Sequence, residues 1–337
     1  MHKAIGIDLG TTELRLSVPA NGIVRRMPSV IAVNQKTKKR MLKFGSFAQK
    51  AVAEHPSLLK LMRSFEGSVL EDPELAKRIF AWCLHEIYPD ETGVRALYSV
   101  PCSLSDAEEC AIVEMLLDSG FKEAFLVYSP VAALIGGGYS LRNTYVSVNI
   151  GARTTDIAVV SDGKIIDRAS VLVGGDAFCN AVSGYVEKKH HMRITFPVAE
   201  RVKRTVGTVW LDGETRVADL VGIDGKNACK QTTISSEEMF TALEEPCALL
   251  LDAICSAAAK IPLERVSDAM EGGIVLSGGG AFLRGLSNMI EGITGFPCRI
   301  PEAAADAVAR GLAASLDRLP QAMMLHNASL VAVKCFY

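Results

Sequence analysis

The sequence predicts an α/β fold built from two related halves, and two observations carry this prediction. A pattern of apolar strand, Gly-containing turn, second apolar strand and closing turn starts at Ala4 and again at Tyr145. Segments with helical periodicity follow each hairpin, and strands that alternate with helices are typical of layered α/β proteins. The length of 337 residues agrees, since domains of roughly 150 residues would give about two.

Corresponding residues near the start and at the end of the two hairpins are separated by the same number of residues. Asp8 and Asn149 lie 141 residues apart (149 less 8), and Gly22 and Gly163 are separated by the same number (163 less 22). Two unrelated hairpins that share common turn residues are the alternative. We favour a repeat because several features occur in the same order.

The turns of the hairpins give more detail. The Thr-Thr pairs that begin at Thr11 and Thr154 are 143 residues apart (154 less 11), which predicts a second loop two residues longer than the first. Asn21-Gly22 and Asp162-Gly163 predict two-residue hairpin turns, because the favoured turns of this length require positive φ at both positions.

Capping signals predict the helices of the first half. Asp72-Pro73 supplies an N-cap and a first-turn proline, and an apolar stripe follows it. Ser105 and Glu108 form a capping box for the next helix. A strand at 124–128 then leads into a helix that begins near Pro130.

The second half contains comparable signals. Ser235 and Glu238 predict a capped helix, and Pro246 is expected to begin the next one. His190-His191 follows two lysines, and we interpret it as a solvated helix end rather than a metal ligand.

Composition disfavours several classes of function. The 36 basic and 38 acidic residues are mixed along the chain, so the net charge of −2 offers no general attraction to nucleic acid or anionic lipid. Nine scattered cysteines without a CxxC motif predict reduced thiols in a cytoplasmic protein. Met1-His2-Lys3 leads directly into a strand, so no signal peptide is expected.

Three short segments have residue types suited to phosphate and a nucleoside. Residues 8–12, Asp-Leu-Gly-Thr-Thr, offer a carboxylate, bare backbone and two hydroxyls. Residues 151–156 form the corresponding loop of the second half. A glycine triplet at 278–280 joins a strand to a helix start, where backbone N–H groups favour an anion or a ribose.

These segments and their neighbours resemble a known family. The stretches IGIDLGTT, VPCSLSDAEECAIVEMLLDSGFKEAFLVYSPVAALIGGG, NIGARTTDIAVVSDGKIIDRASVLVGGDAF and GIVLSGGGAFLRGLSNMIEGITGFP are similar to those of the bacterial actin (MreB) family. They occur in the order found in the superfamily of actins and heat-shock-chaperone ATPases. The similarity extends from about residue 4 to residue 315.

The resemblance implies an actin-like two-domain fold, in which two RNase H-like α/β halves surround a central nucleotide cleft with ATP and Mg²⁺. It implies head-to-tail polymerisation into filaments under the membrane, with cell-wall or membrane proteins as partners. The halves are expected at 1–142, with an outer subdomain at about 30–75, and at 143–320, with an outer subdomain at about 178–265. Residues 321–337 would form a tail that packs as a strand or helix.

Carried over by position, the resemblance also indicates site residues. Asp8 would face the hydrated Mg²⁺, and Glu200 and Lys203 would lie near the ribose and adenine. Gly174-Gly175-Asp176 matches a turn that leads into the outer part of the second half. The full set expected to bind nucleotide is Gly10, Thr11, Thr12, Gly151, Arg153, Thr154, Thr155, Glu200, Lys203, Gly278, Gly279 and Gly280.

Departures from the family pattern bear on catalysis. Ser129 stands where the family has a Glu that orients the attacking water, Asn149 stands where it has an Asp, and Glu13 where it has an Asn. A Ser hydroxyl is a far weaker base than a carboxylate, and loss of a water-positioning group costs ~10²–10⁴ in rate. We therefore expect nucleotide binding to persist and ATP hydrolysis to be slow or absent.

The second loop also departs from the pattern. Ala152 and Arg153 replace glycines of the family. Arg153 either pairs with a phosphate oxygen, which would offset the charge lost at Asn149, or points into solvent and stiffens the loop.

Direct membrane attachment is disfavoured. No amphipathic helix precedes the first strand, and the loop Tyr88-Pro-Asp-Glu-Thr-Gly lacks the apolar pair with which relatives reach lipid. Any membrane association of this cytoplasmic protein would therefore depend on partners or on the tail.

Two other functions remain as alternatives. A non-polymerising nucleotide-binding regulator or chaperone-like ATPase would belong to the same superfamily. A small-molecule kinase would need a catalytic base and larger insertions, neither of which we identify.

Overall fold

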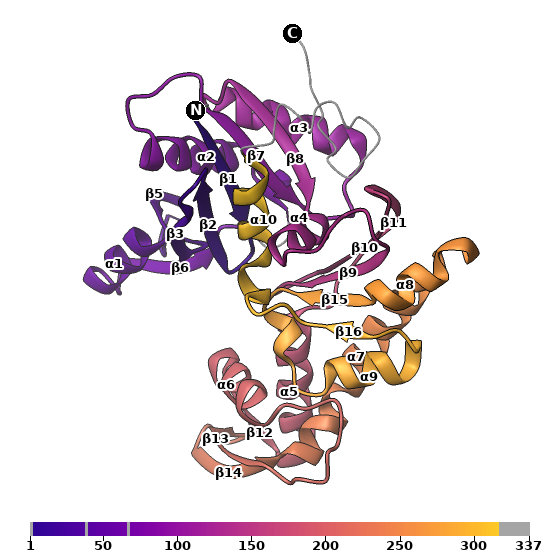
Figure 1. Cartoon of the computed structure of the whole chain (residues 1–337). Helices are drawn as coiled ribbons and strands as arrows, with labels where there is room; N and C mark the ends of the chain where they lie inside the picture. The colour runs from indigo at the N-terminus through magenta and orange to yellow at the C-terminus, as the bar shows by residue number, and fades with distance from the viewer. Residues whose placement is uncertain (1–2, 38–39, 66–67, 317–337) are drawn as a thin grey trace. The chain divides into compact units, whose positions relative to one another are not determined.

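The computed structural model describes residues 3–37, 40–65 and 68–316. The chain divides into two compact units. Figure 1 shows the whole chain, coloured by residue number from indigo at the N-terminus to yellow at the C-terminus. Unit 1 comprises Met1–Arg142, Asp162–Ile165 and Asp306–Tyr337. Unit 2 comprises Asn143–Ser161 and Ile166–Ala305. The expected tail at 321–337 lies outside the described residues.

Unit 1 is organised around a five-stranded mixed sheet in the order β3-β2-β1-β7-β8. Its centre is β1, which pairs antiparallel with β2 and parallel with β7. The predicted strand at 124–128 is confirmed as β8. The bounds are β1 Ala4–Leu9, β2 Glu13–Val18, β3 Gly22–Pro28, β7 Arg95–Val100 and β8 Glu123–Tyr128.

The helices of unit 1 begin where the capping signals predict. Asp72 accepts a hydrogen bond from the Leu75 amide, 3.0 Å, at the start of α2 (Pro73–Ile87). Ser105 and Glu108 form the expected capping box of α3 (Asp106–Asp118). Helix α4 (Ser129–Gly136) follows β8 directly.

A smaller part of unit 1 is a three-stranded sheet in the order β5-β4-β6. Helix α1 packs on this sheet, whereas the short 3₁₀ turn η1 contacts α2 and α3. The bounds are β4 Val30–Asn34, β5 Arg40–Phe44, α1 Ser46–Glu54, β6 Leu59–Arg63 and η1 Val69–Glu71.

Helix α10 (Ala307–Leu316) packs in unit 1, whereas the sequence placed residues 307–316 in the second half. Figure 1 shows it in yellow among indigo and magenta elements. The reason is a close approach of backbones. A Cβ on Gly136 of α4 would lie 1.8 Å from the Ala307 carbonyl oxygen, and a Cβ on Gly311 would lie 1.8 Å from the Ala132 carbonyl oxygen. Only glycine permits this contact.

Unit 2 repeats the main sheet of unit 1 in the order β11-β10-β9-β15-β16. Strand β9 pairs antiparallel with β10 and parallel with β15, as β1 does with β2 and β7. The predicted internal repeat is therefore confirmed. The bounds are β9 Tyr145–Ile150, β10 Thr155–Ser161, β11 Lys164–Val171, β15 Ile274–Ser277 and β16 Cys298–Arg299.

Helices and an outer three-stranded sheet, β12-β13-β14, complete unit 2. One buried apolar cluster joins the main sheet, the helices and the outer sheet. The helices are α5 Gly175–His190, α6 Phe196–Val206, α7 Ser236–Ala258, α8 Val266–Gly272 and α9 Leu286–Thr294, with short 3₁₀ turns η2 Leu263–Arg265, η3 Gly279–Phe282 and η4 Ala304–Asp306. The outer strands are β12 Met192–Arg193, β13 Val217–Asp224 and β14 Cys229–Ser235.

Pro246 does not begin a new helix, contrary to the sequence prediction. It lies inside α7, which starts at the predicted Ser235–Glu238 capping box. A proline inside a helix costs about 3 kcal/mol through a lost hydrogen bond and a clash. The buried stripe that runs from Met239 past Pro246 to Ile254 offsets this cost, because ending the helix would expose it.

Only one of the two predicted hairpin turns has the expected length. Asp162 (φ 50°) and Gly163 (φ 71°) form the two-residue turn between β10 and β11. In the first hairpin Val18 pairs with Gly22, so the turn has three residues and positive φ falls on Ala20 and Gly22. A register shift between Leu16 and Ser17 accompanies this longer turn.

Among the described residues, no single helix has the length and apolar character needed to cross a membrane. One pair, α7 with Leu263–Gly272, meets both criteria together but is bent by 100°.

Candidate nucleotide-binding site

The two predicted phosphate loops have the same length, which corrects the sequence prediction. The Gly10 amide donates to the Glu13 carbonyl oxygen, 3.0 Å, and the Gly151 amide donates to the Thr154 carbonyl oxygen, 2.9 Å. The flanking residues pair as Leu9 with Leu14 in the first hairpin. They pair as Ile150 with Thr155 in the second. Each loop therefore contains four residues.

It follows that the two Thr-Thr pairs are not equivalent. At the constant spacing of 141, Thr154 corresponds to Glu13, and Arg153 to Thr12. Thr155 is a strand residue whose buried hydroxyl donates to the Val173 carbonyl oxygen at 2.6 Å. The repeated Thr-Thr pair suggested a wrong alignment of the two hairpins. The hydrogen bond across each loop, and not the threonines, sets the strand register.

A serine on the neighbouring parallel strand holds the polar residue before each loop. In unit 1 the Ser99 hydroxyl lies 3.3 Å from Asp8 Oδ1. In unit 2 the Ser277 hydroxyl lies 3.2 Å from Asn149 Oδ1. Sequence analysis gave neither serine a role, although Ser277 lies in the predicted glycine-triplet segment and each is a polar residue near the end of a buried strand, which was the available signal.

The glycine triplet packs against the second loop. Gly278 has φ 79°, and a Cβ there would lie 2.3 Å from the Ile150 carbonyl oxygen. A Cβ on Gly280 would lie 2.1 Å from Ile150 Cγ2. Gly279 differs, since a Cβ there would meet nothing within 4 Å. Internal packing thus explains two of the three glycines and leaves the middle one unexplained.

The start of α5 also holds the second loop. The Gly175 amide donates to the Gly151 carbonyl oxygen, 3.0 Å, and the Asp176 amide donates to the Ala152 carbonyl oxygen, 2.7 Å. A Cβ on Gly174 would lie 2.7 Å from the Gly151 carbonyl oxygen. These contacts bind the loop carbonyls to the N-terminus of α5, so the loop has a fixed backbone.

Lys203 of α6 reaches the same region. Its Nζ donates to the Gly175 carbonyl oxygen, 2.9 Å, and lies 3.2 Å from Cys179 Sγ. Burial raises the pKa of Cys179, and the positive charge of Lys203 opposes that shift. Glu200, three residues before Lys203, pairs with Arg204 at 2.7 Å. Unit 2 therefore brings together the second loop, the glycine triplet, the α5 start and Lys203.

In unit 1, Asp8 is partnered by a residue that sequence analysis did not select. Arg15 lies directly across the hairpin from Asp8, and its Nη1 is 3.4 Å from Asp8 Oδ2. Burial raises the pKa of Asp8, while Arg15 and Ser99 oppose that shift. Arg15 could be found only from the strand register.

The Asp8 carboxylate could hold Mg²⁺ only through water molecules bound to the ion. Ser99 and Arg15 each engage one carboxylate oxygen, which leaves lone pairs for a metal-bound water. Asn149 has an amide oxygen that already accepts from Ser277. Within the described part of the chain, no group of three or more His, Cys, Asp or Glu residues is arranged to hold a metal directly.

Ser129 has a structural partner. It is the first residue of α4, and its hydroxyl donates to the Val100 carbonyl oxygen at the end of β7, 3.1 Å. The side chain thus connects the start of α4 to β7 and brings no carboxylate to this position.

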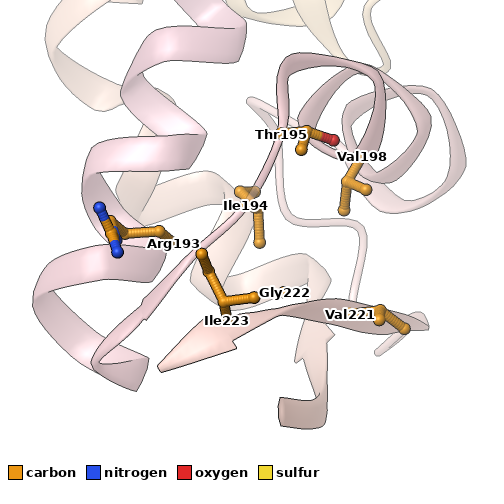
Figure 2. A pocket seen from close by; sticks show the side chains of 7 residues that line it. All are labelled: Arg193, Ile194, Thr195, Val198, Val221, Gly222 and Ile223. Atoms are coloured by element: carbon orange, nitrogen blue, oxygen red, sulfur yellow. The ribbon is translucent and has the colours of Figure 1, made fainter. Parts of the chain in front are cut away.

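A cavity of about 200 Å³ lies elsewhere in unit 2, between β12, β13 and the start of α6 (Figure 2). Its walls are largely apolar, and it includes none of the predicted site residues. Ligand pockets usually measure roughly 300–1,000 Å³, so this cavity is too small for a nucleotide.

The model of the MreB/Mbl protein family matches residues 2–324. The chain belongs to this family. The cell shape-determining protein MreB of Escherichia coli (strain K12) is 31% identical over 324 residues, which cover 94% of this chain and 93% of that protein.

Two solved structures have the same fold as this chain. MreB5 of Spiroplasma citri bound to ADP matches with a TM-score of 0.87 at 23% identity, over 96% of this chain and 99% of that one. The MamK double helical filament matches with a TM-score of 0.76 at 18% identity, over 94% and 98%. The predicted actin-like fold is confirmed.

Proposed function

We propose that the protein is an actin-like, ATP-binding cytoskeletal protein that polymerises head to tail into filaments. Its role would be in cell shape or intracellular organisation, with weakened ATP hydrolysis. Membership of the MreB/Mbl family supports this proposal, as does the relative named cell shape-determining protein MreB. The related MreB5 binds ADP, and the related MamK forms a double helical filament.

The observation that carries the proposal is the assembly of predicted nucleotide residues within unit 2. The second loop packs on Gly278 and Gly280, α5 begins against its carbonyls, and Lys203 lies at that start. Internal packing gives no reason for a bare backbone at Gly279. A nucleoside that needs close approach to the backbone supplies that reason.

Both predicted phosphate loops offer groups that suit phosphate. Gly10, Thr11 and Thr12 offer backbone amides and hydroxyls in unit 1, and Gly151, Arg153 and Thr154 do so in unit 2. Lys203 and Glu200 would contact the ribose and base. Thr155 would act indirectly, because its hydroxyl holds the strand that follows the loop.

Mg²⁺ enters the proposal as a hydrated ion at Asp8. It would supply positive charge to the phosphates when bound. Asp8 would accept hydrogen bonds from its waters, and Ser99 would keep the carboxylate oriented.

Weak hydrolysis follows from the chemistry of two side chains. The Ser129 hydroxyl donates a hydrogen bond to the Val100 carbonyl oxygen, and a hydroxyl is too weak a base to activate water. Asn149 carries no charge where Asp8 carries one in unit 1. We therefore expect nucleotide binding and polymerisation to persist although ATP hydrolysis is slow.

In the cell, the protein would associate mainly with copies of itself in the cytoplasm. Contact with the membrane or cell-wall machinery would pass through partner proteins. Nucleic acid is not expected as a partner, given the balanced charge of the chain.

Sedimentation and electron microscopy test the polymerisation. The purified protein is compared without nucleotide, with ATP and with a non-hydrolysable ATP analogue. We expect filaments in the pellet with either nucleotide. A protein that stays in the supernatant under all three conditions, while still binding ATP, would instead be a non-polymerising regulator.

A further inference from the structure

Arg15 is the centre of an ion cluster in unit 1. Its guanidinium contacts Asp8 (Nη1 to Oδ2, 3.4 Å), Glu13 through Nη2, and Asp306 (Nε to Oδ1, 3.2 Å). Asp306 lies just before α10 and also pairs with Arg26. The Arg15–Asp306 contact is an ion pair without hydrogen-bond geometry.

Most of this cluster is shielded from solvent. Asp8 exposes 15% of its side chain, Arg15 17% and Asp306 22%. Water and salt therefore screen the charge of Arg15 at Asp8 much less than they would screen a surface pair. Three carboxylates and two guanidinium groups leave the cluster with one net negative charge.

The second hairpin lacks this arrangement. There Asn149 lies across from Asp156, so an amide and an acid occupy the positions that Asp8 and Arg15 occupy in the first hairpin. A guanidinium directly across the hairpin from the polar residue before the loop is thus found in the first hairpin, where the predicted cation residue lies, and not in the second.

We propose that Arg15 supplies at Asp8 much of the positive charge that Mg²⁺ would otherwise supply, so that adenine nucleotide binds with little dependence on Mg²⁺. This proposal rests on the nucleotide binding proposed above. Arg15 satisfies the Asp8 carboxylate in the absence of a cation. The cluster as a whole is negative, but Arg15 is the group in contact with Asp8, so its charge opposes a divalent ion that approaches this carboxylate. Like charges a few ångström apart weaken cation binding on the order of tenfold even at the dielectric constant of water.

A purely structural role for Arg15 is the competing explanation. Through Asp306, Arg15 connects the hairpin to the start of α10, and its loss would lower stability. Such a role would leave the Mg²⁺ dependence of nucleotide binding unchanged, so this dependence separates the two explanations.

The experiment titrates a fluorescent ATP analogue into the full-length protein with MgCl₂ or with EDTA. The quantity compared is the ratio of the two dissociation constants. Arg15→Met keeps the apolar stem and removes the charge, and Arg15→Lys restores the charge. Arg26→Met is the matched control, since Arg26 pairs with Asp306 and has no contact with Asp8 in the described structure.

We expect a ratio within about threefold for the wild type, Arg15→Lys and Arg26→Met. For Arg15→Met we expect binding at least about tenfold tighter with Mg²⁺ than with EDTA. Thermal unfolding checks that each variant is folded, and Arg15→Gln replaces Arg15→Met if the latter is not.

Three results are distinguishable. A wild type that binds at least about tenfold tighter with Mg²⁺ overturns the role of Arg15 while nucleotide binding stands. A folded Arg15→Met or Arg15→Gln protein that keeps the wild-type ratio overturns it as well. A wild type that binds no nucleotide in either buffer refutes the proposed function itself.

Discussion

Ser277 donates a hydrogen bond to Asn149 across two parallel strands, with 3.2 Å between Oγ and Oδ1. The bond from Ser99 to Asp8, 3.3 Å, occupies the same position in the other sheet. The repeat therefore includes the contact that orients the polar residue before each loop. It also shows that the second half has an amide where the first half has a carboxylate.

Restoring a carboxylate by Asn149→Asp should lower the stability of the nucleotide-free protein. Asp156 is buried and lies across the hairpin from residue 149, so two acids would be neighbours. We expect the free energy of unfolding in urea to fall by about 1–2 kcal/mol. Asn180→Asp, at an exposed position of α5, is the control and should have little effect. An Asn149→Asp protein as stable as the wild type would show that the two neighbouring carboxylates do not destabilise the fold.

The glycine triplet should separate structural from ligand-binding roles. Gly280→Ala forces a Cβ into Ile150, so we expect a loss of at least about 2 kcal/mol in the free energy of unfolding. Gly279→Ala meets nothing in the protein and should leave the melting temperature unchanged while it weakens ATP binding several-fold. Differential scanning fluorimetry and a nucleotide titration measure the two quantities. Gly279→Ala with wild-type affinity would mean that the nucleotide does not approach this residue.

Ser129→Glu should accelerate ATP hydrolysis. A carboxylate at the start of α4 can orient and activate water, and such groups contribute ~10²–10⁴ in rate. The substitution also removes the hydrogen bond to Val100, which costs about 1 kcal/mol of stability. Phosphate release is measured for both proteins, with Ser129→Ala as the control for the lost hydrogen bond. The explanation for slow hydrolysis fails if the wild type already turns over faster than Ser129→Glu.

Lys203→Met should weaken nucleotide binding without unfolding the protein. Lys203 brings a positive charge to the α5 start, and a hydrogen bond to a charged group contributes about 1.5–3 kcal/mol. The affinity for ATP should therefore fall about 10–100-fold. Arg201→Gln, also on α6, removes a charge that contacts the Asp219 carbonyl oxygen and should leave affinity unchanged. Equal losses in both variants would point to a general effect of charge.

Local signals predicted much of the fold. The capping boxes at Ser105 and Ser235 and the proline cap at Asp72 located three helix starts, because a cap depends on residues within one turn. The paired hairpins also followed from their alternating pattern. Pro246 misled the prediction because the buried stripe of α7 continues on both sides of it.

Register and long-range pairing limited what the sequence could predict about the site. The second loop, the glycine triplet and Lys203 meet in unit 2, as the resemblance implied, but the repeated Thr-Thr letters suggested a false alignment. Arg15 was missed because its role depends on which residue faces it across the hairpin. Asp306 is distant in sequence and joins the cluster only through the packing of α10.

Calorimetric titration of ATP into the purified protein tests the central claim most directly. We predict saturable binding of one nucleotide per chain with a dissociation constant on the order of micromolar, or about −8 kcal/mol. Gly279→Ala, titrated in parallel, should bind more weakly at unchanged stability. Absence of binding heat at millimolar ATP, with and without Mg²⁺, would contradict the account.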